Sequence, residues 1–230
     1  MSTARLARID ARLRQCACVS ECSLGASLVV RDLTARHGFA QDPVVRETWV
    51  MVAESRPEST ESGLVANGEG WFVLNAREAR WRHGPGRPAI CSFEGEPKFP
   101  QLGINLNVVA PGEALGMYHW EADQEDFLVL AGEALLIVEG EERPLRQWDF
   151  VHCPAGTNHI IVGGGDEPCV VLAVGARDRS KGPEWGGYSV DRAALRRDAG
   201  VEEETSDPAR EYARFAKREP SLYHEGWLPG

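Results

Sequence analysis

The sequence predicts an all-β protein whose strands pair antiparallel in a barrel or jelly roll, with short C-terminal helices and a flexible N-terminal extension. The chain has 24 Gly and 14 Pro in 230 residues, which favours many short elements joined by turns. From residue 71 onward, short apolar runs alternate with turn signals at the spacing typical of β sandwiches and barrels. No gap between the runs is long enough for the helix of a parallel crossover, so we expect antiparallel pairing.

Changes in composition divide the chain into three parts. Residues 1–68 mix charged, Ser and Gly residues with few apolar ones, and we interpret them as a partly disordered extension. Residues 69–178 hold the strand-like runs, and residues 179–230 form a C-terminal helical strap. Met51 stands just before the polar stretch of the extension and is a candidate start of translation.

Eight apolar runs bounded by Gly, Pro or Asp residues are predicted as strands. They are residues 71–75, 89–93, 104–109, 126–131, 134–139, 148–152, 159–162 and 169–175.

Two helices are expected after the last strand. The first begins near Ser189 or Asp191 and stops at Gly200, and the second has Asp207 as its N-cap and Pro208 in its first turn. The aromatic side chains of this region are interpreted as packing groups: Tyr212, Phe215, Tyr223 and Trp227.

The charge of the chain argues against two classes of partner. With 25 Lys and Arg against 35 Asp and Glu, the net charge is −10, which disfavours a nucleic acid or an anionic membrane surface. No apolar stretch is long enough for a membrane-spanning helix. The six Cys are scattered through a chain too large to need disulfides, so we expect a reduced, cytoplasmic setting.

One segment gathers acidic side chains and a histidine at the edge of a predicted hairpin. His119 and Glu121 are two residues apart, so on a strand they point to the same face about 7 Å apart. Glu125 follows a turn and begins the next strand. Taken alone, Glu121, Asp123, Glu125 and Asp126 would be interpreted as a solvated acidic turn.

A second segment supplies another histidine. Pro154 and Gly156 set a tight turn, after which His159 begins a strand. Folding of the sheet into a barrel would bring His159 opposite the first cluster. His152 lies in the preceding strand beside Cys153 and is interpreted as structural.

These residues resemble the two motifs of the cupin superfamily. The first motif corresponds to Gly112, His119, Glu121, Glu125 and Gly132, and the second to Pro154, Gly156 and His159. The resemblance covers about residues 100–176 and is to a small single-domain cupin of the cupin 2 type.

The chain departs from the family pattern at two positions. Glu121 stands where the first motif has its second histidine, and Gly163 stands where an asparagine often closes the second motif. The resemblance implies His119, Glu125 and His159 as ligands of a divalent metal ion. Glu121 is either a fourth ligand or a catalytic general base beside the ion. These ligand types suit Fe, Mn, Ni or Zn and do not choose among them.

Strand parity identifies the side chains that face the barrel interior. Phe127, Val129 and Ile161 are expected to point inward and line a small apolar substrate pocket. Four further residues are expected to point outward and are also apolar: Leu128, Leu130, Leu136 and Val138. Such an outer face must be covered by a second sheet, by the C-terminal strap or by a partner subunit, and we expect a homodimer.

Two functions remain open from the sequence. The first is a metal-dependent cupin enzyme acting on a small organic molecule by oxygenase, isomerase or decarboxylase chemistry, because this fold hosts all three. The alternative is a non-catalytic cupin that binds a sugar or another metabolite. A third hypothesis is a structural dimer that binds no ligand.

Overall fold

A computed structural model describes residues 51–96, 98–177 and 185–230. The chain divides into two compact units, Met1–Ala53 and Glu54–Gly230, and all the elements below belong to the second unit. Most of the expected N-terminal extension lies outside the described residues. The division into residues 1–68, 69–178 and 179–230 stays a prediction.

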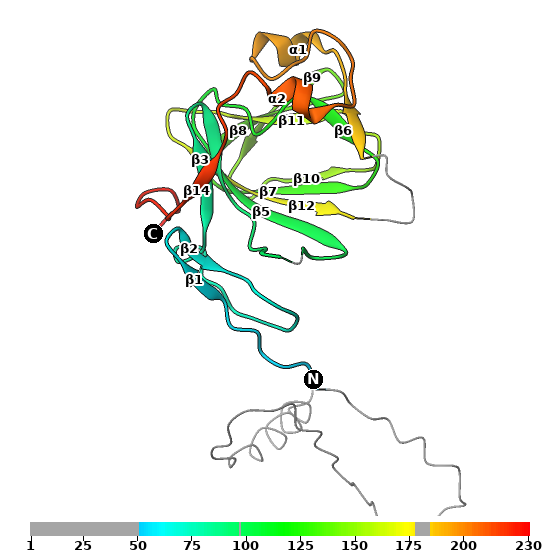
Figure 1. The fold of residues 1–230 in the computed structure, drawn as a ribbon. Coiled ribbons are helices and arrows are strands. Elements are labelled where there is room, and N and C mark those ends of the chain that lie inside the picture. The colour runs from blue at the N-terminus through cyan, green and yellow to red at the C-terminus, as the bar shows by residue number, and fades with distance from the viewer. Residues whose placement is uncertain (1–50, 97, 178–184) are drawn as a thin grey trace, which may run out of the picture. The chain divides into compact units, whose positions relative to one another are not determined.

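Two antiparallel sheets form the fold (Figure 1). The seven-stranded sheet has the order β10 (Phe150–Cys153), β7 (Glu125–Ala131), β12 (Cys169–Ala176), β5 (Leu102–Val109), β4 (Arg87–Cys91), β3 (Trp81–Gly84) and β14 (Glu219–Ser221). The five-stranded sheet has the order β13 (Gly186–Tyr188), β6 (His119–Glu121), β11 (His159–Gly163), β8 (Glu133–Val138) and β9 (Glu141–Arg146). A separate hairpin joins β1 (Glu58–Thr60) to β2 (Gly63–Val65). The predicted all-β antiparallel class is therefore confirmed.

The main core lies between the two sheets. Phe127 from the larger sheet and Leu136 and Ile161 from the smaller one belong to a single cluster of buried side chains. Leu136 and Val138 therefore point inward, and their predicted outward orientation is wrong. The cause is register: Leu136 pairs directly with Ile161, and directly paired residues share one face of a sheet.

Parts of the outer faces of both sheets are covered by the chain itself, whereas Phe150 on β10 stays 63% exposed. Ile137 and Ile160 on the smaller sheet pack against Ala193 and Ala194 of helix α1 (Arg192–Arg196). On the larger sheet, Trp81 anchors a second cluster that also includes partly buried side chains from the last residues of the chain: Tyr223, Trp227 and Leu228. The C-terminal strap was one of the three covers considered from the sequence.

Both predicted helix starts are confirmed. The Asp191 side chain accepts a hydrogen bond from the Ala194 backbone N–H at 2.8 Å and caps α1. The Asp207 side chain accepts from the Ala209 N–H at 2.9 Å and caps α2 (Pro208–Tyr212), which has its proline in the first turn. Among the described residues, no helix is long and apolar enough to cross a membrane.

The predicted strands differ from the structure in two ways: one predicted run is not a strand, and several observed strands lie outside the predicted runs. The unpredicted strands include β1, β2, β3, β9, β13 and β14. The run 71–75 is not a strand, because only Trp71 forms an isolated bridge, with Glu54, and Val73 is 80% exposed. Conversely, β9 was not predicted because its sequence, EERPLR, is polar and contains a proline. An edge strand tolerates both features, since one of its sides has no partner to bond and both of its faces reach solvent.

Gly163 explains one departure from the family pattern. A Cβ at this position would overlap the carbonyl oxygen of Ala110, because the loop before β6 approaches the end of β11. The Gly112 N–H donates to the Gly163 carbonyl, and the Gly163 N–H donates to the Glu113 carbonyl, each at 2.9 Å. An asparagine therefore does not fit here without movement of the backbone.

We predict that Gly163→Asn lowers the free energy of unfolding by about 1 to 3 kcal/mol, the usual cost of forcing extra atoms into a packed site. Gly86→Asn is the matched control, because a Cβ there meets nothing within 4 Å. Its φ of +66° is one that asparagine adopts, so the cost should stay below about 1 kcal/mol. Urea unfolding measures both values, and equal effects of the two substitutions would contradict this account of Gly163.

Candidate metal centre

Strand pairing brings the two motif histidines together. His119 on β6 is the direct partner of His159 on β11, so both side chains lie on the same face of the smaller sheet. The ring centroids are 4.9 Å apart. The His159 side chain is 2% exposed and that of His119 is 17% exposed, so the pair lies mostly inside the fold.

Glu125 reaches the histidines from the opposite sheet. It is the first residue of β7, and its Oε2 lies 3.0 Å from His159 Nε2 and 3.6 Å from His119 Nε2. One ligand atom from each of these three residues lies within 4.8 Å of the others. Two imidazoles and a carboxylate at this spacing suit a divalent transition metal ion.

Backbone carbonyls fix the orientation of both imidazole rings. The carbonyl of Met117 lies 2.7 Å from His119 Nδ1, and that of Thr157 lies 2.9 Å from His159 Nδ1. A carbonyl can only accept a hydrogen bond, so each Nδ1 donates its proton. In a neutral ring Nε2 is then left with a free lone pair facing Glu125, the arrangement that metal-binding histidines need. The residues present therefore fit a bound metal ion.

The turn before His159 is fixed by a glycine. Gly156 has φ of +84°, which an L side chain rarely adopts, and its N–H donates to the Glu121 carbonyl at 2.8 Å. This bond ties the turn to the end of β6. The predicted Pro154–Gly156 turn thus positions both histidine-bearing strands.

In the metal-free state, the three groups form a charged network. Burial raises the pKa of Glu125, but hydrogen bonds from His119 and His159 outweigh burial and hold the pKa at about 2. Burial lowers the pKa of His159, but interactions with Cys153 and Glu125 outweigh it and raise the pKa to about 10. The pKa of His119 is also raised, because hydrogen bonds to Glu121 and Glu125 outweigh burial.

Glu121 lies beside this group rather than within it. Its Oε1 is 3.6 Å from His119 Nε2, as its position two residues along the strand predicts. The Glu121 side chain is 29% exposed, against 16% for Glu125. It therefore lies closer to solvent than the other carboxylate.

The three predicted pocket residues are buried in the interior. Phe127, Val129 and Ile161 are 3%, 0% and 1% exposed. The Phe127 ring lies 5.3 Å from the His159 ring, centroid to centroid, so it forms an apolar wall beside the histidines. Ile161 packs in the main core between the sheets.

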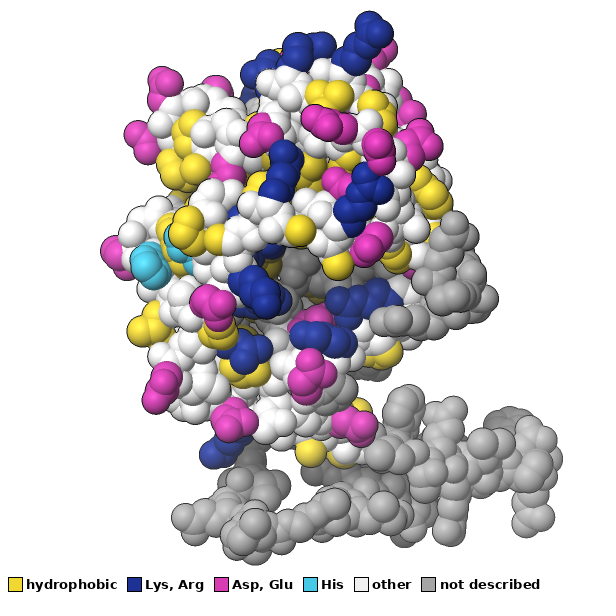
Figure 2. All heavy atoms as spheres, turned by 45° about the horizontal axis from the view of Figure 1, so that its top comes forward, with side chains coloured by type: hydrophobic (Ala, Val, Ile, Leu, Met, Phe, Trp, Pro, Cys, Tyr) yellow, Lys and Arg dark blue, Asp and Glu magenta, His cyan; other side chains and the backbone are white. Residues whose placement is uncertain are grey.

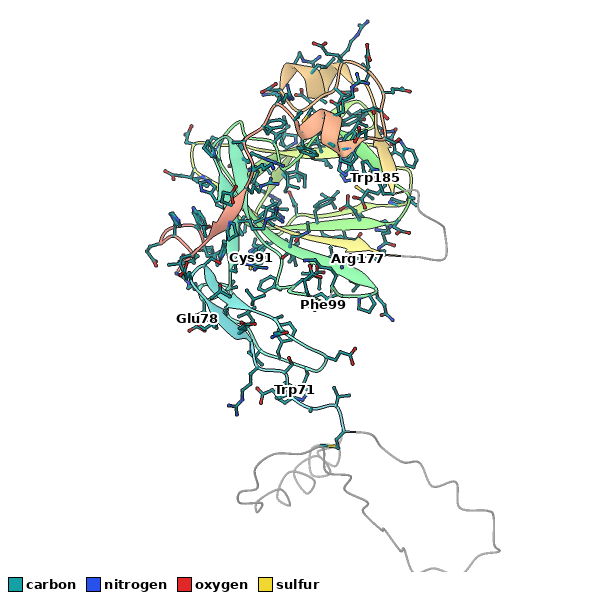
Figure 3. The ribbon with its side chains drawn as sticks, viewed as in Figure 1. Trp71, Glu78, Cys91, Phe99, Arg177 and Trp185 are labelled. Carbon is teal, nitrogen blue, oxygen red and sulfur yellow. The ribbon has the colours of Figure 1, made fainter. Side chains whose placement is uncertain are left out.

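Two aromatic neighbours of His119 were not found from the sequence. Trp185, labelled in Figure 3, lies just before β13, and Tyr188 ends this strand. Their ring centroids lie 6.2 and 6.1 Å from that of His119. Residues 177–188 contain three glycines and no strand-like pattern, so only the pairing of β13 with β6 reveals the position of the two rings.

His152 lies apart from the cluster, in agreement with its interpretation as structural. Its side chain is 51% exposed, and its Nδ1 lies 2.6 Å from Asp126 Oδ1. His152 and Asp126 are direct partners on β10 and β7. Asp126, one of the acidic residues of the predicted turn, is therefore paired with His152.

Residues 105–175 match the family model described as "Cupin domain". No curated protein matches the chain.

Solved structures resemble part of the chain. A putative sugar phosphate isomerase from Acidithiobacillus ferrooxidans is 27% identical, with 46% of this chain and 75% of that chain covered and a TM-score of 0.42. A sugar phosphate isomerase from a cupin superfamily from Silicibacter pomeroyi is 26% identical, with 46% and 76% covered and a TM-score of 0.40. A cupin 2 conserved barrel domain protein from Salinispora arenicola is 24% identical, with 47% and 89% covered and a TM-score of 0.38.

The charged network predicts how the stability of the metal-free protein depends on pH. The pKa of His159 is higher in the folded protein than in the unfolded chain, where it is about 6.5, so protonated His159 stabilises the folded state. This contribution is fully present below about pH 6.5 and is lost as the pH rises towards about 10. The pKa of Glu125 is lower in the folded protein than the ordinary value of 4.5, so ionised Glu125 stabilises the folded state. This contribution is fully present above about pH 4.5 and is lost as the pH falls through about 2.

We therefore expect the free energy of unfolding, measured after treatment with a chelator, to be highest between about pH 4.5 and 6.5. Above about pH 6.5 the free energy of unfolding should fall by up to about 1.4 kcal/mol per pH unit for each proton that the folded protein binds and the unfolded chain does not. His159→Gln should flatten the alkaline slope, whereas His152→Gln, which alters an exposed histidine, should leave it unchanged. An equal slope in wild type and His159→Gln would contradict the proposed network.

Proposed function

Because residues 105–175 form a cupin domain, we propose that this protein binds a divalent metal ion through His119, Glu125 and His159 and uses it to act on a small organic molecule. The observation that carries the proposal is the convergence of two Nε2 atoms on one carboxylate, with both Nδ1 atoms already bonded to backbone carbonyls. The second histidine, His119, is oriented in the same way as His159 and lies 3.6 Å from the same carboxylate, so one Glu125 oxygen faces two imidazoles at once.

The charge of the ligand set leaves the ion reactive. Two neutral imidazoles and one carboxylate give a complex of net charge +1 with a divalent ion. Such an ion polarises an oxygen atom of a bound substrate or activates water or dioxygen. With three protein ligands, positions remain for exogenous molecules.

The surrounding residues define what the protein itself contributes. Glu121, at 3.6 Å from His119 and partly exposed, is placed to accept a proton from a substrate beside the ion. Phe127 on one side and Trp185 and Tyr188 on the other present rings to the histidines. These apolar walls exclude water and favour a small substrate with an apolar part. Homodimer formation and a cytoplasmic location stay predictions from the sequence.

We expect protein purified without added metal, and then reconstituted with Fe(II), Mn(II), Ni(II) or Zn(II), to hold about one ion per chain by mass spectrometry of the metal. His159→Gln and Glu125→Gln should each abolish stoichiometric binding, because each removes one of the three ligands. His152→Gln is the control and should bind as wild type does, since His152 is paired with Asp126 outside the cluster. Metal content that is equally low in wild type and His159→Gln would refute the proposal.

Glu121→Gln separates a ligand from a neighbouring base. If Glu121 acts beside the ion, the substitution should lower metal affinity by about 10- to 100-fold, as for groups that only support a ligand. Glu125→Gln should lower it far more. A competition titration against a chromophoric chelator measures both, and equal losses would make Glu121 a fourth ligand.

The metal-loaded protein can then be screened for oxygen consumption with small phenols, diketones and hydroxy acids. Oxygen consumption distinguishes an oxygenase from an isomerase, a decarboxylase or a non-catalytic binding protein. Turnover that Glu121→Gln removes while metal stays bound supports catalysis. Ligand binding without turnover supports the non-catalytic alternative.

A further inference from the structure

A cleft of about 400 Å³ has arginine side chains in its lining and none of the three candidate metal ligands. Its walls come from the β3–β4 hairpin, from the loop before β6 and from the segment that begins with α2. The residues that matter are Arg87, Arg218, Glu113, Tyr212 and Phe215. In an acidic chain of net charge −10, a cleft with an excess of arginine requires an explanation.

Arg87 is held in place by aromatic rings and not by an acid. Its guanidinium carbon lies 4.8 Å from the centroid of the Tyr212 ring and 5.5 Å from that of Phe215. Stacking of this kind orients a guanidinium while leaving its N–H groups free to bond elsewhere. Within the described part of the chain, no carboxylate forms an ion pair with Arg87.

Arg218 is partly buried beside Arg87. Its Nε donates to the Pro88 carbonyl at 3.0 Å, which fixes the side chain and leaves the two terminal nitrogens available. Burial and the nearby charges of Arg87 and Arg82 lower the pKa of Arg218 to about 10. Two like charges brought together in a partly buried cleft are unfavourable unless an anion compensates them.

The lining of the cleft contains two acidic residues, Glu113 and Asp198, against three arginines. One oxygen of Glu113 accepts from the Ala110 N–H at 3.2 Å. Burial raises the pKa of Glu113 against the effects of Ala110, His83, Arg218 and Arg87. The other charged residues at the rim are already paired: Asp198 with Arg214 at 3.2 Å, and Arg197 with Glu142 at 3.1 Å.

We propose that this cleft binds the phosphate or carboxylate group of a small organic anion, with Arg87 and Arg218 as the residues that recognise it. Guanidinium groups bind such oxyanions with paired, charge-assisted hydrogen bonds. A volume of about 400 Å³ is that of a small-molecule site. On the face drawn in Figure 2, Lys and Arg side chains gather in the middle, with Asp and Glu side chains around them.

The test is calorimetric titration of the full chain, treated with a chelator, with sodium phosphate or sodium acetate at constant ionic strength set by chloride. We expect saturable binding of at least one of the two, with a dissociation constant of about 1 mM, because an inorganic ion makes only part of the contacts of the full ligand. Tighter binding of phosphate identifies a phosphorylated ligand, and tighter binding of acetate identifies a carboxylate.

Variants identify the site. Arg87→Met and Arg218→Met should each weaken binding by about 10-fold or more, a loss of at least 1.4 kcal/mol. Arg143→Met is the control, because Arg143 is exposed and pairs with Glu141 on β9. Arg87→Lys retains the charge but not the planar group, so it should weaken anion binding less than Arg87→Met does. This intermediate effect shows that the loss in Arg87→Met does not result from misfolding.

The anion should still bind to His159→Gln, which distinguishes binding in the cleft from binding at the metal centre. A negative result for the cleft therefore leaves the proposed metal-dependent function untouched. Absence of saturation by both anions at about 50 mM, or equal binding by wild type and Arg218→Met, would overturn the proposal.

Discussion

The direct pairing of His119 with His159 across β6 and β11 is the constraint on which the candidate site depends. A shift of one residue in this register would turn one histidine to the outer face, where α1 packs. The register is secured at both ends of β11. The Gly156 N–H bonds to the Glu121 carbonyl at one end, and Gly163 bonds to the loop before β6 at the other. Glu125 then completes the cluster from the facing sheet.

The C-terminal segment contributes to the site more than its sequence suggests. It covers the outer face of the smaller sheet through α1 and adds β13, with Trp185 and Tyr188, beside His119. The Tyr212 hydroxyl also accepts a hydrogen bond from the Met117 N–H at 3.3 Å, and the Met117 carbonyl accepts one from His119 Nδ1. One tyrosine of α2 thus supports the backbone that orients a metal-binding candidate and also forms the aromatic surface under Arg87.

Local patterns in the sequence were sufficient for much of this structure. The spacing of His119, Glu121 and Glu125, the turn before His159 and the caps Asp191 and Asp207 depend on neighbours close in the chain. The polar edge strand β9 and the aromatic walls could not be predicted, because their positions depend on pairing with distant segments. The arginine cleft combines residues near 87, 113 and 218, which no local pattern connects.

We propose that two imidazoles and a carboxylate hold one metal ion. X-ray absorption at the metal edge of the reconstituted protein examines these ligands directly. We expect a first shell of nitrogen and oxygen only, with the outer scattering of two imidazole rings. A sulfur ligand, which would implicate Cys153 next to His159, or scattering from fewer than two imidazoles would contradict this proposal.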